Sequence, residues 1–199
     1  MNVRVSQLLS FTAGMWHNGT VEMNQYIIKL WMITQTSDPV EQNIAFRRMT
    51  HFIYNELDST IFINSNEKNK CAELVQVGFN ITTLPGDSVD QLIGIMLLHK
   101  LNAIMEGRIS ILEVEISTAD ELVYLHGEHE ISEDLTQPVW WSTPDLVHAD
   151  ILDRIENTVS MQSVTNWRDL ELAWSNACTD GDTENIIVFA DLKFGDDTK

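Results

Sequence analysis

The sequence predicts an α+β protein with a mostly antiparallel sheet, helices layered on that sheet, and a central buried helix over residues 88–106. Asn18-Gly19 separates two stretches that can extend, and this dipeptide supplies the positive φ angles of a tight hairpin turn. Apolar residues occupy most of the circumference between residues 88 and 106, as in a buried helix. Strand-like and helix-like segments alternate along the chain, which favours helices packed on a sheet.

The stretches on either side of the turn, 3–13 and 20–34, are predicted to pair as strands. In the second stretch apolar residues occur at both odd and even positions, for example Ile27 and Trp31 at odd positions and Ile28 at an even one. A strand that is apolar on both faces is typical of the centre of a sheet. We therefore expect this strand to be central and covered on both sides.

A helix is predicted to begin at Asp38-Pro39, because Asp38 can accept a hydrogen bond from the first turn and Pro39 fits that turn. Apolar residues at helical spacing continue the helix to an expected end at 57–59. A short strand over 60–64 and a helix over 67–77 are expected to follow.

The start of the central helix is predicted from Ser88 and Gln91, which have the spacing of a capping box. A strand is expected over 109–117, and its alternation slips at Leu112, which indicates a bulge. A further strand over 121–126 is expected to pair back on it as a hairpin.

The polar, acidic stretch 127–139 is predicted to be a loop. Beyond it we expect helices over 143–159 and 166–178 and a last strand over 186–194. The length fits a single α+β domain over residues 1–199. The best candidate for a sub-boundary is 127–139, which would separate an acidic C-terminal part.

The charge of the chain is concentrated in its second half. The 199 residues carry a net charge of -18. Residues 1–100 hold seven basic and nine acidic residues, whereas residues 101–199 hold five and twenty-one. Such a surface repels phosphate groups, so we expect no direct nucleic-acid partner. The asymmetry instead favours a protein partner with a basic surface, or a solvated face that keeps the protein soluble.

The compartment is predicted to be the cytoplasm. The first residues lack the apolar core and cleavage site of a signal peptide, and no window holds about 18 uninterrupted apolar residues, so no membrane partner is expected. The chain has only two cysteines, Cys71 and Cys178, which we interpret as reduced thiols.

Short catalytic motifs are absent from the sequence: it contains no phosphate-binding loop, no dinucleotide fingerprint, no nucleophile elbow and no HExxH. This favours binding over catalysis, and no cofactor is expected. The weak candidates for a metal site are His126, Glu128 and His129, since imidazole and carboxylate are ligands that Zn²⁺ and Fe²⁺ accept. The alternative is a polar hairpin end that happens to hold two histidines.

Trp140 and Trp141 form the most unusual candidate for a binding surface. Adjacent side chains point different ways from an extended segment, so two neighbouring indoles are hard to bury together. An exposed tryptophan is a typical anchor for a protein partner. The alternative is that both cap the core. Asp145, Asp153 and Glu156 are expected on the outer side of the next helix, beside these anchors.

The run ITTLPGDSVDQLIGIMLLHKLNAIMEG, residues 81–107, resembles a segment of uncharacterised proteins of T4-like marine phages, and YIIKLWMIT, residues 26–34, is similar to another part of them. The resemblance covers about the first two-thirds of the chain and carries no functional motif. It implies a virus-encoded protein working in a bacterial host cytoplasm.

Three functions are compatible with these observations. The first is a non-enzymatic protein-binding factor, directed at the host or at virion assembly, that presents its acidic surface to a partner. The second is a metal-dependent hydrolase or nuclease that uses the 126–130 cluster. The third is a structural subunit whose apolar strands and aromatic side chains are covered by self-association into a homo-oligomer. We favour the first, because no catalytic motif is present.

Overall fold

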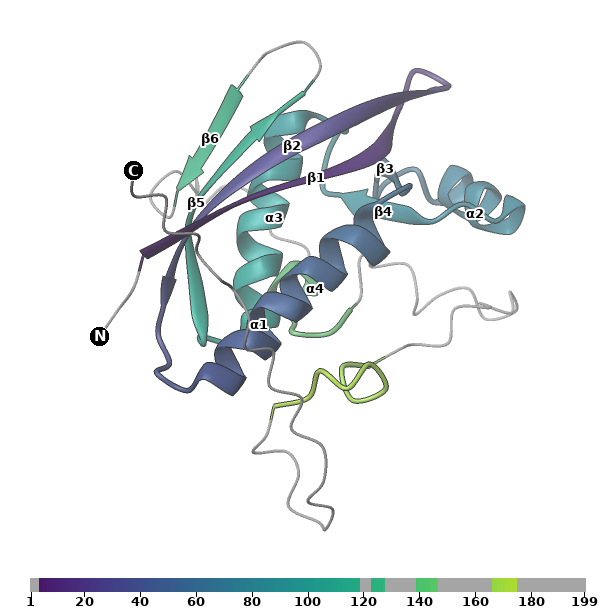
Figure 1. Cartoon of the computed structure of the whole chain (residues 1–199). Helices are drawn as coiled ribbons and strands as arrows, with labels where there is room; N and C mark the ends of the chain where they lie inside the picture. The colour runs from purple at the N-terminus through teal and green to yellow at the C-terminus, as the bar shows by residue number, and fades with distance from the viewer. Residues whose placement is uncertain (1–3, 119–122, 128–138, 147–165, 175–199) are drawn as a thin grey trace, which may run out of the picture.

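The computed structural model describes residues 4–118, 123–127, 139–146 and 166–174. A six-stranded sheet lies at its centre, in the order β4-β3-β1-β2-β5-β6 (Figure 1). The elements in chain order are β1 (Arg4–His17), β2 (Thr20–Thr34), α1 (Pro39–His51), the π-helix η1 (Phe52–Leu57), β3 (Ile61–Asn64), α2 (Lys68–Val77), β4 (Ile81–Leu84), α3 (Asp90–Met105), β5 (Ile109–Ser117), β6 (Val123–Gly127) and α4 (Val139–Ser142).

The α+β class is confirmed, but the sheet is mixed, so the expectation of a mostly antiparallel sheet is wrong. The β1–β2, β2–β5 and β5–β6 pairs are antiparallel, whereas β1–β3 and β3–β4 are parallel. The β3–β4 pair is parallel because α2 connects the two strands, and a helical crossover returns the chain in the same direction. Strand β4 was not predicted; it has only four residues, two of them threonines.

The hairpin at Asn18-Gly19 is confirmed. Both turn residues have positive φ, 49° at Asn18 and 87° at Gly19, as a type I′ turn requires. The register runs from the pair His17 and Thr20 to the pair Arg4 and Ile33. The two longest strands of the structure are therefore fixed against each other by a local signal.

One face of this hairpin is buried and the other is open. Inward side chains such as Tyr26 and Ile28 are fully buried beneath α1 and α3, which lie on the same side of the sheet (Figure 1). Ile27 and Trp31 point the other way and are exposed, and no described element covers them. The prediction that β2 is central is confirmed by its place between β1 and β5. The prediction that both its faces are covered is wrong in this part of the chain.

The helix that begins at Asp38 forms as predicted: the Asp38 carboxylate accepts a hydrogen bond from the Val40 amide at 2.8 Å. It continues without a break into η1 and ends at Leu57. Helix α3 starts two residues later than predicted, because its N-cap is Val89 and no side chain caps it; the capping box of Ser88 is therefore wrong. No helix in the described ranges is long and apolar enough to cross a membrane.

The predicted bulge at Leu112 is confirmed by the register between β2 and β5. Trp31 pairs with Glu113 and Met32 pairs with Ile111, so Leu112 is the extra residue. The Asn102 side chain of α3 stabilises this point: its amide donates to the Ile111 carbonyl at 3.2 Å, and its oxygen accepts from the Ile111 amide at 2.8 Å. A helix side chain thus supplies hydrogen bonds beside the bulge.

The last described segments differ from their predictions. Residues 143–146 are bends, and 166–174 consist of turns over 167–171 and irregular backbone, so no helix forms in either of these described stretches. Glu171 adopts φ 57°, a left-handed conformation that a continuous helix does not allow. Most of the proposed sub-boundary at 127–139, the remainder of both predicted helices and the predicted strand 186–194 lie outside the described residues.

Candidate functional site

Trp140 and Trp141 are core residues, with exposed fractions of 2% and 0%. Their rings meet edge to face with centroids 6.0 Å apart, and Trp141 stacks on His99 at 6.2 Å. The prediction that both are exposed anchors is therefore wrong. The alternative is observed: both residues belong to the core. They are buried together because they lie in the short helix α4, not in an extended segment. Asp145 is exposed close by, whereas Asp153 and Glu156 lie outside the described residues.

Lys100 holds this tryptophan segment in place. The side chain comes from α3 and is fully buried. Its ammonium group donates hydrogen bonds to the carbonyl oxygens of Trp140 at 2.8 Å, Thr143 at 3.0 Å and Asp145 at 2.6 Å. The three acceptors match the three N–H donors of a protonated lysine. The sequence does not reveal this role of Lys100, because the carbonyl groups that it contacts lie 40 or more residues away.

We expect stability to rise from pH 7 to pH 10 in the wild type relative to Lys100→Met. Burial lowers the pKa of Lys100 to about 7, whereas an unfolded lysine titrates near 10.4. Between these values the unfolded state binds more protons than the folded state, so the free energy of unfolding increases with pH. The three carbonyl groups favour the ammonium form and limit the gain to about 1–2 kcal/mol. Urea unfolding of both proteins at pH 7 and pH 10 measures this gain. The prediction is contradicted if the difference in unfolding free energy between the wild type and Lys100→Met is the same at both pH values.

Arg48 holds the other late segment, residues 166–174. Its guanidinium donates to the Leu172 carbonyl at 2.7 Å and to Glu106 Oε1 at 2.7 Å. The same group lies over the rings of Trp174 at 3.9 Å and Trp167 at 4.8 Å. The Trp174 indole N–H also donates to Glu106 at 2.7 Å. Charge, hydrogen bonds and cation–π contacts thus join α1, the end of α3 and the turn segment in one cluster, in which Arg48 is buried and Glu106 is exposed.

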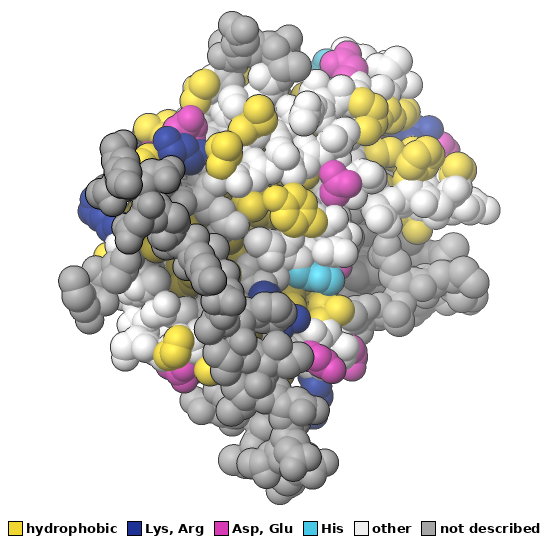
Figure 2. Space-filling model, in the orientation of Figure 1, with side chains coloured by type: hydrophobic (Ala, Val, Ile, Leu, Met, Phe, Trp, Pro, Cys, Tyr) yellow, Lys and Arg dark blue, Asp and Glu magenta, His cyan; other side chains and the backbone are white. Residues whose placement is uncertain are grey.

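The most extended candidate for a functional surface is the side of the sheet that faces away from α1 and α3. We call it the outer face: the outward side chains of β1, β2, β5 and β6. Figure 2, in the orientation of Figure 1, shows hydrophobic side chains gathered over these strands. The strand registers and exposures place seven large exposed apolar residues on it: Leu8, Val21, Met23, Ile27, Trp31, Val123 and Leu125. Exposed apolar patches of more than a few hundred Å² are unusual on monomers and mark interaction sites.

The outer face is electrically neutral although the chain carries a net charge of -18. Its charged residues are Arg4 and Lys29 against Glu113 and Glu115. The glutamates form a stripe on β5 between the apolar side chains of β2 and those of β6, and Lys29 pairs across the strands with Glu115. Sequence parity alone pointed to this surface through Ile27 and Trp31, but not to its exposure.

The metal candidates divide between described and undescribed residues. His126 belongs to β6, where it pairs with Val114, whereas Glu128 and His129 lie outside the described residues. Within the described ranges no group of three or more His, Cys, Asp or Glu side chains is arranged to hold a metal ion. The proposed cluster at 126–130 therefore stays a prediction.

Comparison with known proteins gives structural likeness only. No protein-family model matches the sequence, and no curated protein matches it. A 6-pyruvoyl tetrahydropterin synthase from Caenorhabditis elegans is 14% identical, with 64% of this chain and 96% of that chain covered and a TM-score of 0.42. An uncharacterized protein from Wolinella succinogenes is 10% identical, with 64% of this chain and 99% of that chain covered and a TM-score of 0.48. The 6-pyruvoyl tetrahydropterin synthase from Plasmodium falciparum is 16% identical, with 63% of this chain and 98% of that chain covered and a TM-score of 0.39. At these values the likeness assigns no activity to the chain.

Proposed function

We propose that the protein is a non-enzymatic structural subunit that works by self-association, with a second copy of the chain covering its outer face. The observation that carries the proposal is the set of large apolar side chains exposed on β1, β2 and β6. Burial of such side chains is the main driving force of protein association. Because Trp140 and Trp141 are buried, this function displaces the one that used them as partner anchors.

Charge favours a second copy as the occupant. Two chains of net charge -18 repel each other, and that repulsion is weakest where the contacting surfaces are neutral. The outer face carries two basic and two acidic residues. In a two-fold arrangement the same patch meets itself, so Lys29 of one copy is available to Glu113 or Glu115 of the other. A strongly basic partner would find little negative charge on this face.

Self-association is tested with the double variant Leu8→Glu/Leu125→Lys. Leu8 pairs across the strands with Lys29, and Leu125 pairs with Glu115, so each new charge faces an opposite one within its own sheet. The net charge of the chain is unchanged, and the side chains replaced are 69% and 50% exposed. We expect the wild type to sediment as a dimer or larger assembly at about 100 μM, and the variant to sediment as a folded monomer.

The matched control is Val77→Lys/Phe79→Glu, which replaces two exposed apolar residues near the end of α2 that are not among the outward side chains of β1, β2, β5 and β6. This control should self-associate as the wild type does. A wild-type protein that is monomeric at that concentration overturns the proposal, as does an oligomer that the outer-face variant leaves intact. The first result would point to a different protein as the occupant.

The acidic surface of the second half stays a separate prediction. Of its twenty-one acidic residues only six lie in the described ranges. Asp145 is exposed and compatible with a basic partner, but a continuous acidic face rests on residues outside those ranges. Origin in a phage and action in a host cytoplasm likewise rest on the sequence resemblance alone.

A further inference from the structure

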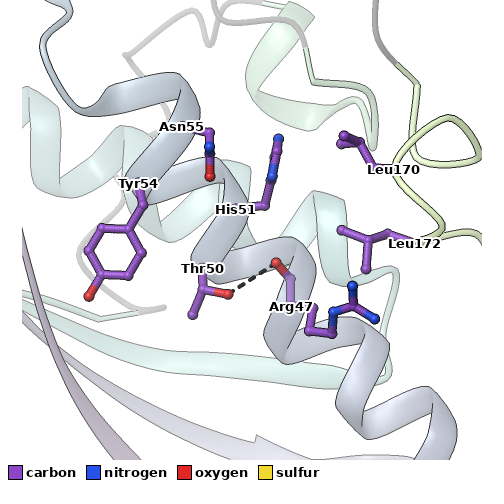
Figure 3. A pocket seen from close by; sticks show the side chains of 7 residues that line it. All are labelled: Arg47, Thr50, His51, Tyr54, Asn55, Leu170 and Leu172. Atoms are coloured by element: carbon purple, nitrogen blue, oxygen red, sulfur yellow. Dashed lines mark hydrogen bonds between the residues drawn. The ribbon is translucent and has the colours of Figure 1, made fainter. Parts of the chain in front are cut away.

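A pocket lies on the helical side of the molecule, away from the outer face. It has a volume of about 250 Å³ and is formed by the end of α1, the start of η1 and the turn segment 166–174 (Figure 3). A water-sized group takes up about 30 Å³, so the pocket has room for roughly eight such groups. The pocket therefore suits a small molecule, and it is independent of the self-association proposed above because α1 covers the opposite face of the sheet.

The polar side chains of the pocket are mostly hydrogen-bond donors. Arg47 contributes an exposed guanidinium, and no carboxylate in the described part of the chain pairs with it. His51 and Asn55 follow Arg47 on the same helical run, and none of the described residues that line the pocket is acidic. Among the described lining residues Arg47 carries the formal charge, and that charge is positive. The group it fits is an anion.

The opposite wall is apolar. Leu170 and Leu172 face the polar side chains across the pocket in Figure 3. Leu172 is fixed there, because its carbonyl accepts the hydrogen bond from the buried Arg48. A ligand that uses both walls needs a charged end and a short hydrocarbon body.

His51 is held in position by its surroundings. Its Nε2 lies 3.5 Å from Glu56 Oε1, and its ring meets the Trp167 ring edge to face at 6.2 Å. Burial lowers the pKa of His51 and raises the pKa of Glu56. The imidazole sits where α1 passes into a π-helix, an irregularity that is common at functional sites.

We propose that this pocket binds a small organic acid, with its carboxylate on Arg47 and its aliphatic chain against Leu170 and Leu172. One guanidinium matches the two oxygens of a carboxylate, which arginine binds through two parallel N–H donors. A phosphate group carries more charge than one arginine neutralises. The pocket is open to solvent at Arg47 and Asn55, so the acid enters without a change of fold.

The probe for this site is hexanoate, which has eight non-hydrogen atoms. In a ¹H–¹⁵N titration of the intact protein we expect shifts at the amides of residues 47–55 and 170–172, with a Kd of roughly millimolar. Hexanol presents the same chain without charge, and inorganic phosphate presents charge without a chain. Both should bind at least fivefold more weakly than hexanoate.

Two variants test the assigned contacts. Arg47→Gln should weaken hexanoate binding at least tenfold, because it removes a charge-assisted pair of hydrogen bonds. The matched control is Arg168→Gln, an exposed arginine of the same turn segment that does not line the pocket, and it should bind as the wild type does. Equal binding by Arg47→Gln, phosphate binding as tight as hexanoate binding, or shifts confined to other residues would each overturn the proposal.

Discussion

Arg48→Met is expected to lower the free energy of unfolding by about 3–4 kcal/mol. The substitution keeps an unbranched apolar side chain but leaves the Leu172 and Ile104 carbonyl oxygens without the guanidinium that donates to them. Glu106 loses its ion pair with Arg48 and keeps the hydrogen bond from the Trp174 indole. The Trp167 ring also loses the cation that lies over it, whereas the Trp174 ring keeps the Arg108 guanidinium at 4.3 Å. Because Arg48 is 2% exposed, water does not replace these interactions in the folded state.

The same variant should detach the segment 166–174 before the rest unfolds, because its docking contacts centre on Arg48. Limited proteolysis then cuts near this segment faster than in the wild type, and urea unfolding gives the loss of stability. Arg47→Met is the matched control: the neighbouring arginine is exposed, and its loss should change stability by less than about 0.5 kcal/mol. Equal stabilities for the two variants would contradict the role given to Arg48.

Features that depend on a few neighbouring residues could be predicted from the sequence. The turn at Asn18-Gly19 needs only two residues with positive φ, and the start of α1 needs only Asp38 beside Pro39. The bulge at Leu112 is visible as a slip of parity within one strand. In each of these the physical cause lies within a few bonds of its effect.

Features that join distant parts of the chain could not be predicted in this way. Arg48 lies within a predicted helix, but its carbonyl partner at Leu172 is 124 residues away. Lys100 is likewise satisfied by backbone groups, which have no sequence pattern of their own. The parallel pairing of β3 with β4 depends on the path of α2, and the hydrophobic pattern alone does not fix that path.

The outer face shows the same limit in the candidate site. The parity of Ile27 and Trp31 showed that β2 is apolar on both sides, which is correct. Alternation along a strand shows the side of the sheet to which a residue points, but it does not show what covers that side. A face that another part of the chain covers and a face that a second copy covers therefore give the same sequence pattern. The choice between them needed exposed fractions, and those come only from coordinates.

Trp141→Ala is expected to destabilise the protein by about 3–5 kcal/mol. Its ring is fully buried, stacks on His99 and meets Trp140 edge to face, so truncation leaves a cavity between α3 and α4. Trp141→Phe should cost much less, since the ring contacts are largely kept and the indole N–H has no hydrogen-bond partner among the described residues. A tryptophan that served as an exposed anchor would show neither effect.

Trp31→Ala is the control that separates the two roles. Trp31 lies on the outer face and is 39% exposed, so its loss should leave the stability of a dilute monomer nearly unchanged and weaken self-association. Urea unfolding at low protein concentration measures the first property, and sedimentation at high concentration measures the second. If Trp141→Ala unfolds like the wild type while Trp31→Ala is destabilised by several kcal/mol, the assignment of core and interface to these two indoles is reversed. Destabilisation of both by the same amount would instead mean that the outer face is buried within the monomer, and self-association would lose its basis.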